Sequence, residues 1–417
     1  MSFSAWKEVE LGDVCSKIGS GSTPTGGANV YSESGISLIR SQNILDFKFS
    51  DIGLAYINEI QAKKLNIVTI EEGDVLLNIT GDSVARSCIV PKDILPARVN
   101  QHVAIIRGLQ NSVYNRYILY YLQNNKTYLL SIAGTGGTRN ALTKKMIENL
   151  NIKLPPFHEQ KAIADTLSCL DDKIELNNRI NKTLEEMAQA IFKSWFVDFE
   201  PFQEGEFENS ELGRIPKGWR VGTISDLGDI IGGSTPSKTR DEYYTDKGIA
   251  WITPKDLSNN KDKFISKGEI DITDLGLKNS STKIMPKGTV LFSSRAPIGY
   301  MAIAKNNFTT NQGFKSIVPK SNIGTAYIYC FLKSNIDVIE NRASGSTFME
   351  VSGSVMKQIP ALIPSDSVLE RFQNICSLYF NQQMLLENQN QTLTTIRDSL
   401  LPKLMSGEIR VPIDEVQ

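Results

Sequence analysis

The tetrapeptide Gly21-Ser22-Thr23-Pro24 occurs a second time as Gly233-Ser234-Thr235-Pro236, and these two copies anchor a repeat that runs through the chain. Five further matches keep the same order, at offsets of 209 to 215 residues. They pair Trp6 with Trp219, 35–40 with 248–253, 73–77 with 288–292, Asn100-Gln101 with Asn311-Gln312, and Leu154-Pro155 with Ile363-Pro364. A period this long indicates a duplicated domain rather than a solenoid of short repeats.

Each copy has the same internal plan. Short β-like runs, such as 75–79, 103–106 and 249–252, alternate with clusters of Gly, Ser, Thr and Pro. A short helix is expected over 114–124 and again over 325–334, and a long helix closes each copy. The predicted fold class is therefore α+β. It consists of two similar α/β domains joined by two long antiparallel helices that form a coiled coil, with the pseudo-twofold symmetry of a tandem repeat.

This plan divides the chain into five segments. They are a first α/β domain (1–156), a central long helix (157–199), an acidic linker (200–218), a second α/β domain (219–365) and a C-terminal long helix with its tail (366–417). The linker sequence, with its acidic and turn-forming residues, indicates a surface connection.

The long helices show heptad spacing, which predicts a buried seam. Its first positions are Ile163, Leu170, Asn177, Leu184 and Ile191 in the first helix, and Phe372, Tyr379, Leu386, Leu393 and Leu400 in the second. Its second positions are Thr166, Lys173, Ile180 and Met187 in the first helix, and Ile375, Gln382, Gln389 and Ile396 in the second. The simplest partner for each seam is the other helix, running antiparallel; the alternative is that each helix packs on its own domain. The acidic pairs Asp171-Asp172 and Glu185-Glu186 are expected on solvated helix faces.

The net charge of −1 hides an alternation along the chain. The five segments carry +3, −3, −3, +5 and −3. Two basic domains separated by acidic parts suit two DNA-facing units.

The sequence offers little catalytic chemistry. Only two histidines occur, His102 and His158, which argues against most histidine metal sites and a histidine base. The glycine-rich stretch 134–138 is not followed by the lysine of a phosphate-binding loop. The five scattered cysteines are interpreted as buried free thiols. Neither an apolar run of 18 residues, as a transmembrane helix needs, nor a secretory signal peptide is visible. We therefore expect a cytoplasmic protein with no catalytic residue, metal or cofactor of its own.

The order of these parts resembles the specificity subunits of Type I restriction-modification systems. The local matches are 154–164 (LPPFHEQKAIA), 186–199 (EMAQAIFKSWFVDF), Gly218-Trp219 and the two Gly-Ser-Thr-Pro turns. The second copy departs from the pattern, because it has Ile363-Pro364-Ser365-Asp366 in place of the Pro-Pro-x-x-Glu-Gln element. The second helix is therefore expected to dock its partner less symmetrically.

The resemblance implies a division of labour. Each domain would read one half of a split sequence in double-stranded DNA, and the helices would set the gap between the halves. The helices would also bind two methyltransferase subunits, which use S-adenosylmethionine, and separate restriction subunits with motor and nuclease activity would cleave the DNA. A coiled-coil adaptor with two protein- or ligand-binding domains is the alternative from another class. The third possible function is that of a methyltransferase or nuclease in its own right.

DNA readout needs hydrogen-bonding side chains that reach base edges. The candidates are Ser20, Ser22, Thr23, Arg40, Gln42, Asn43, Thr80, Arg86, Asn100, Gln101 and Arg139 in the first copy, and Ser234, Thr235, Lys255, Ser293, Ser294, Arg295, Asn311, Gln312 and Ser346 in the second. A structural hydrogen bond in a turn or strand is the competing interpretation for each of them. Positions shared by both copies, such as Asn100 and Asn311, favour a fold-holding role. Positions that differ, such as Arg40 against Thr253 and Gln42 against Lys255, are the better candidates for specificity.

Overall fold

The computed structural model describes residues 6–134, 140–295, 297–345 and 349–412. The chain forms two compact units, and each is described by itself. Unit 1 comprises Met1–Ile174 and Gln391–Gln417, and unit 2 comprises Glu175–Asn390. These units cut across the predicted segments, because each of them takes one end of both long helices.

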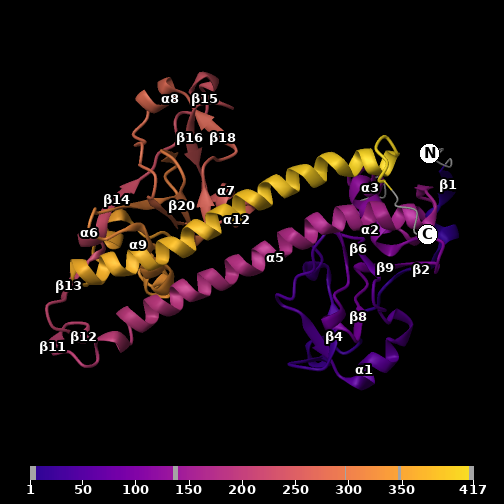
Figure 1. The fold of residues 1–417 in the computed structure, drawn as a ribbon, viewed down its shortest axis with the longest axis horizontal. Coiled ribbons are helices and arrows are strands. Elements are labelled where there is room, and N and C mark those ends of the chain that lie inside the picture. The colour runs from indigo at the N-terminus through magenta and orange to yellow at the C-terminus, as the bar shows by residue number, and fades with distance from the viewer. Residues whose placement is uncertain (1–5, 135–139, 296, 346–348, 413–417) are drawn as a thin grey trace. The chain divides into compact units, whose positions relative to one another are not determined.

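Unit 1 contains two four-stranded sheets with the strand orders β2-β9-β6-β7 and β3-β5-β4-β8, and a separate β1-β10 pair (Figure 1). Its strands are β1 (Lys7–Glu10), β2 (Cys15–Ser20), β3 (Tyr31–Ser32), β4 (Ile36–Ile39), β5 (Ala55–Ile57), β6 (Val75–Asn78), β7 (Ser87–Ile89), β8 (Ala97–Val99), β9 (Val103–Gly108) and β10 (Asn151–Leu154). Its shorter helices are α1 (Glu59–Lys64), α2 (Asn115–Asn124), α3 (Lys126–Ala133) and α4 (Lys144–Glu148).

Unit 2 repeats this plan with the strand orders β14-β22-β19-β20-β17 and β15-β18-β16-β21 and a β13-β23 pair. Its strands are β11 (Phe207–Ser210), β12 (Gly213–Pro216), β13 (Arg220–Thr223), β14 (Gly228–Gly232), β15 (Tyr244–Thr245), β16 (Ile249–Ile252), β17 (Phe264–Ile265), β18 (Ile270–Ile272), β19 (Val290–Ser294), β20 (Ile298–Ala304), β21 (Thr309–Thr310), β22 (Lys315–Pro319) and β23 (Pro360–Ile363). Its shorter helices are α6 (Ile224–Leu227), α7 (Pro254–Asn259), α8 (Asp274–Lys278), α9 (Thr325–Ser334), α10 (Ile336–Glu340) and α11 (Gly353–Lys357). The equivalent strand orders confirm the duplication, and α2 and α9 confirm the two short helices. The predicted linker is partly a hairpin, formed by β11 and β12.

The two long helices are α5 (Phe157–Phe196) and α12 (Asp366–Ser406). Pro155 and Pro156 precede α5, because proline disfavours helical backbone in the residue before it. An acidic residue lies in the first turn of each helix and a lysine in the last, which suits the helix dipole.

The two helices run antiparallel within each unit. In unit 2, Gln383 donates to the carbonyl of Asn181 at 2.9 Å, and Asn390 donates to Asn178 at 2.8 Å. In unit 1, Leu167 shares a buried cluster with Leu401 and Leu404. Each helix end also packs on the domain of its own unit, so both predicted modes of burial occur together.

The predicted first seam positions are all buried or half-buried, whereas five of the eight second positions are exposed. One of these five, Gln389, still accepts a hydrogen bond across the helix pair from Asn177 at 2.8 Å. Thr166, Met187, Gln382, Gln389 and Ile396 are exposed. The next residue along is buried or half-buried in each case, namely Leu167, Ala188, Gln383, Asn390 and Arg397. The reason is that each helix packs against a domain as well as a helix, which rotates the buried face by one residue.

The expectation that Asp171 lies on a solvated face is wrong. Its carboxylate accepts hydrogen bonds from Tyr120 at 2.6 Å and from Arg397 at 2.7 Å. Burial raises the pKa of Asp171, although both of these partners act to lower it. The Arg397 guanidinium also lies 4.0 Å from the ring centroid of Phe47. This network fastens the first domain to both helices within unit 1.

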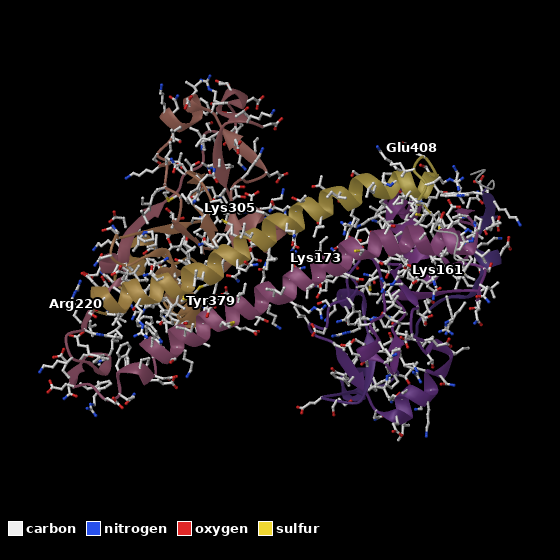
Figure 2. The ribbon with its side chains drawn as sticks, viewed as in Figure 1. Lys161, Lys173, Arg220, Lys305, Tyr379 and Glu408 are labelled. Carbon is white, nitrogen blue, oxygen red and sulfur yellow. The ribbon has the colours of Figure 1, made fainter. Side chains whose placement is uncertain are left out.

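The expectation is wrong for Glu185 as well. Its carboxylate forms ion pairs with Lys263 and, at 2.5 Å, with Lys333. Burial acts to raise the pKa of Glu185, but the two lysines outweigh it and lower that pKa overall. Lys263 also donates to Gln383 at 2.6 Å and lies 3.7 Å from the ring centroid of Phe380. A second polar contact joins Lys305 to Asn388 of α12 at 2.8 Å. Figure 2 labels Lys305 beside this helix.

The cysteines are free, but not all of them are buried. Cys88, Cys330 and Cys376 are buried, whereas Cys169 is exposed and Cys15 is half-buried. The interpretation of five buried thiols is therefore wrong for Cys169, which lies on the solvent face of α5. Among the described helices, none is both long enough and apolar enough to span a membrane.

Candidate nucleic-acid interface

The Gly-Ser-Thr-Pro turn packs against the loop after β8 in unit 1 and after β21 in unit 2. A Cβ atom on Gly21 would lie 2.1 Å from the Val99 carbonyl oxygen, and one on Gly233 would lie 2.1 Å from that of Asn311. The following residue extends the contact, since the Ser22 amide donates to Val99 at 3.0 Å. Only glycine allows so close a backbone approach.

The Asn-Gln pair forms the second part of each site. The Asn100 side chain accepts from the His102 amide at 3.1 Å, and Asn311 accepts from Gly313 at 2.9 Å. The backbone amides of the same two asparagines donate to the carbonyls of Ile39 and Ile252, the last residues of β4 and β16, at 3.0 and 3.1 Å. Both asparagines therefore hold a turn, while Gln101 and Gln312 are exposed.

The third part is a capped turn at the end of β4 and of β16. The Arg40 amide donates to Asn43 Oδ1 at 3.1 Å, and the Thr253 amide donates to Asp256 Oδ2 at 2.7 Å. Asn43 is fully buried, so its polar atoms are committed to the loop. We call the three turns together the turn cluster, which comprises 20–24, 40–43 and 100–102 in unit 1 and 233–236, 253–256 and 311–313 in unit 2.

Other predicted residues of unit 1 adjoin the cluster. Thr80 bonds to His102 Nδ1 at 2.7 Å. The Asn78 side chain donates to the Ser41 carbonyl at 2.9 Å, and the Asn78 backbone amide donates to the Arg86 carbonyl at 2.8 Å, which places Arg86 beside the cluster. The Arg86 guanidinium makes no hydrogen bond or ion pair with another described residue. Arg139 lies outside the described residues.

Three other predicted residues of unit 2, Ser293, Ser294 and Arg295, form hydrogen bonds or ion pairs within the protein. Ser293 and Ser294 are fully buried and bond to the carbonyls of Pro297 and Gly313 at 2.8 and 3.3 Å. Arg295 pairs with Glu350 at 3.4 Å. Ser346 lies outside the described residues. In this conformation the two buried serines cannot reach a base edge.

The structure brings four predicted residues of unit 2 together around one hollow of about 350 Å³. Thr235, Lys255, Asn311 and Gln312 line it, and Thr235 donates to Gln312 across it. Lys238, Trp251 and Glu269 also contribute to the lining. Glu269 bonds to Lys255 at 2.6 Å, and this hydrogen bond raises the pKa of that lysine. The hollow offers donors, acceptors and cations on one surface, which are the groups that DNA recognition uses.

Sequence reasoning missed Glu269, Lys238 and the exposed Ile52. The sequence feature that could have located Ile52 and Glu269 is an extension of the repeat, since the neighbouring glycines Gly53 and Gly268 are 215 residues apart, like the segments 73–77 and 288–292. The described residues contain no group of three or more metal-ligating side chains of the kind that could hold an ion.

The protein-family model described as "Type I restriction modification DNA specificity domain" matches residues 4–186 and 216–394 of this chain. The chain belongs to this family. The specificity subunit of the Type I restriction enzyme HindI from Haemophilus influenzae is 29% identical over 97% of this chain and 100% of its own length. The MjaIX specificity subunit from Methanocaldococcus jannaschii is 44% identical over 46% of this chain and 45% of its own length.

The fold agrees with this membership of the specificity-domain family. The crystal structure of the S subunit of a Type I restriction-modification system from M. genitalium superposes with a TM-score of 0.59, at 16% identity. The match covers 97% of this chain and 96% of that one. Both family matches end inside a long helix, so each specificity domain includes part of its helix as well as its sheets.

Proposed function

We propose that this chain is the DNA-recognition subunit of a Type I restriction-modification complex. The observation that carries the proposal is the double match to the specificity domain, on two units with equivalent strand order. Each unit has its own turn cluster, so each would read one half of a split target in double-stranded DNA. The scaffolds are alike but the side chains differ, and the two halves should therefore differ in sequence.

This role implies which tasks the other subunits of the complex perform. Two methyltransferase subunits would dock on the long helices and would hold the S-adenosylmethionine. Restriction subunits would supply cleavage, and this chain would perform no chemistry. The relatives support this division by their names as specificity subunits of restriction enzymes. The long helices would fix the gap, so deleting one heptad from either helix should change the gap or abolish binding.

Methylome sequencing tests the proposal most directly. The chain is expressed with its methyltransferase partner in a strain without DNA methylation, and the methylated adenines are mapped. We expect one asymmetric motif with two specified halves and an unspecified gap. A continuous palindrome, or no methylation that depends on this chain, would contradict the proposal.

Duplex binding separates a DNA reader from an adaptor of another class. Affinity should fall steeply between 50 and 200 mM salt, by about 10³-fold or more if six or more phosphates are contacted. In the same assay, the isolated chain should transfer no methyl group from S-adenosylmethionine until the partner is added. A salt-independent affinity, or transfer by the chain alone, would favour one of the two other classes.

A further inference from the structure

The capped turn and a second loop form a matched pair of elements in the two units. In unit 1 the loop 51–53 precedes β5, and in unit 2 the loop 267–269 precedes β18. The strand registers show that they are equivalent, since β5 pairs with β4 through Ile57 and Ile36, and β18 pairs with β16 through Ile272 and Ile249. We call the capped turn and this loop together the double loop, which comprises 40–43 with 51–53 in unit 1 and 253–256 with 267–269 in unit 2.

The inner part of the double loop is the same in both units. Asn43 donates to the carbonyls of Ser50 and Ile52 at 2.9 and 3.2 Å. Asp256 performs the equivalent task by accepting from the Glu269 amide at 2.8 Å. The glycines approach the capped turn closely, since a Cβ on Gly53 would lie 2.6 Å from Gln42 Nε2. A Cβ on Gly268 would lie 3.0 Å from Asp256 Oδ2 in the turn and 2.5 Å from the Trp251 carbonyl oxygen in the strand that leads into it.

The segment between the two parts of the double loop is fixed to α12. In unit 1 this segment contains Phe47, whose ring lies against Arg397. In unit 2 it contains Lys263 and Phe264, whose amides donate to Glu387 at 2.7 and 3.1 Å. The double loop is therefore held at several points, and ordering it on binding should need little conformational entropy.

The outer side chains, in contrast, differ between the units. Unit 1 presents Ile52, which is 81% exposed, on a loop that Arg40 and Gln42 bind through the Gly53 carbonyl at 2.6 and 3.1 Å. Unit 2 presents the Lys255–Glu269 pair, whose side chains are 67% and 68% exposed. An isoleucine so exposed adds little to folding, yet three side-chain hydrogen bonds, from Arg40, Gln42 and Asn43, hold the loop that carries it.

From these observations, and resting on the proposed function, we infer that the double loop determines which half-site each unit reads. In unit 1, Ile52 makes an apolar contact with the C5 methyl group of a thymine, which marks an A·T pair in the major groove. In unit 2, Lys255 donates to the O6 and N7 atoms of guanine, and Glu269 accepts from the N4 amino group of cytosine. The common inner scaffold explains how two domains of one fold read different sequences.

The experiment compares Ile52→Ala with Ile60→Ala in the full chain, assembled with its methyltransferase partner. Ile60 is the matched control, because it is 68% exposed in the same unit but lies on α1 outside the double loop. Methylation rates are measured on the wild-type target and on all single-base variants of both half-sites. For Ile52→Ala we expect discrimination to drop about tenfold at one A·T pair of one half-site, with the other half unchanged. Ile60→Ala should keep every preference.

The pair in unit 2 is tested by Lys255→Met and Glu269→Gln on the same substrates. Both should relax the preference at G·C positions of the other half-site only. Melting temperatures close to that of the wild type would show that the variants fold. Unchanged base preferences in Ile52→Ala, Lys255→Met and Glu269→Gln would overturn the inference while the wild type still reads a split target. Failure of the wild type to read any split target would instead overturn the proposed function.

Discussion

Asp171 on α5 accepts a hydrogen bond from Arg397 on α12 at 2.7 Å, and the two side chains are only 17% and 11% exposed. The pair joins the two long helices within unit 1, and Tyr120 brings the first domain into the same network. A buried ion pair adds little net stability, but removing one partner leaves an uncompensated charge. Its main effect is to favour one register between the helices, since any shift along them would separate the charges.

We therefore expect Arg397→Met to destabilise unit 1 by about 3 kcal/mol. The double variant Asp171→Leu with Arg397→Met should recover most of that loss, because an apolar pair needs no desolvation. Scanning calorimetry of the three proteins measures both effects. Asp398→Asn is the control, since Asp398 is exposed and also pairs with Arg397, and it should change stability by less than about 1 kcal/mol. A double variant as unstable as Arg397→Met would contradict this account.

Glu387 gives unit 2 a pH-dependent stability. Burial raises the pKa of this carboxyl from 4.5 to about 7, with Asp262 adding to the effect, and the amides of Lys263 and Phe264 only partly oppose it. A raised folded-state pKa means that the folded protein binds the proton more tightly than the unfolded chain. The stabilising contribution is therefore complete below pH 4.5 and is lost as the pH rises through 7.

Relative to Glu387→Gln, the wild-type free energy of unfolding should fall by up to roughly 3 kcal/mol between pH 5 and pH 8. Urea unfolding followed by tryptophan fluorescence measures this, because Trp195, Trp219 and Trp251 all lie in unit 2. Glu370→Gln, an exposed change on the same helix, should track the wild type at both pH values. Parallel stability curves for the wild type and Glu387→Gln would refute the prediction.

The first Gly-Ser-Thr-Pro turn requires glycine at position 21, whereas the nearby Gly19 of β2 can be replaced. Gly21→Ala places a Cβ atom 2.1 Å from a carbonyl oxygen, whereas Gly19→Ala meets no atom within 4 Å. We expect Gly21→Ala to destabilise the protein by about 1 to 3 kcal/mol and to weaken methylation of the target. Gly19→Ala should be neutral or stabilising by up to about 1 kcal/mol, since alanine loses less entropy in a strand. Equal effects of the two substitutions on melting temperature would show that the close approach is relaxed at little cost.

The sequence predicts those features that depend on local spacing. The two Gly-Ser-Thr-Pro turns and their ordered partners predicted the duplication, and the equivalent strand orders confirm it. The long helices begin directly after Pro156 and Ser365. The heptad pattern located the buried first positions, such as Asn177 and Phe372, because apolar or hydrogen-bonding residues recur there every seven positions.

What the sequence does not predict depends on contacts between distant segments. Asp171 and Arg397 are 226 positions apart, so their pairing, which removes Asp171 from solvent, has no local signature. The rotation of the seam, which exposes Ile396 and buries Gln383, follows from packing of the domains on the helices. Ile52 resembles any strand residue in sequence, and only the fold shows that it points outward on a fixed loop.

The departure of the second copy from the Pro-Pro-x-x-Glu-Gln element has a structural compensation. Gln160 is buried on α5, where it accepts from the Tyr114 amide at 2.9 Å and donates to the carbonyls of Pro155 and Ser112 at 2.9 and 3.1 Å. In unit 2, Gln373 of α12 accepts from the Ala326 amide at 3.0 Å. Each glutamine therefore binds the first turn of the short helix, α2 or α9, although Gln373 lies one turn further along its helix.

Because the buried Gln160 side chain satisfies three backbone groups that are buried or half-buried, Gln160→Ala should destabilise unit 1 by about 2 to 3 kcal/mol. Gln373→Ala should destabilise unit 2 by about 1 kcal/mol, since Gln373 is only half-buried and serves one amide. Gln382→Ala, an exposed change on α12, should stay within about 0.5 kcal/mol of the wild type. Hydrogen exchange can test the assignment, because the Tyr114 and Ala326 amides should lose protection in the respective variants only. If Gln373→Ala left the Ala326 amide protected, the two glutamines would not be equivalent, and the second copy would lack this connection altogether.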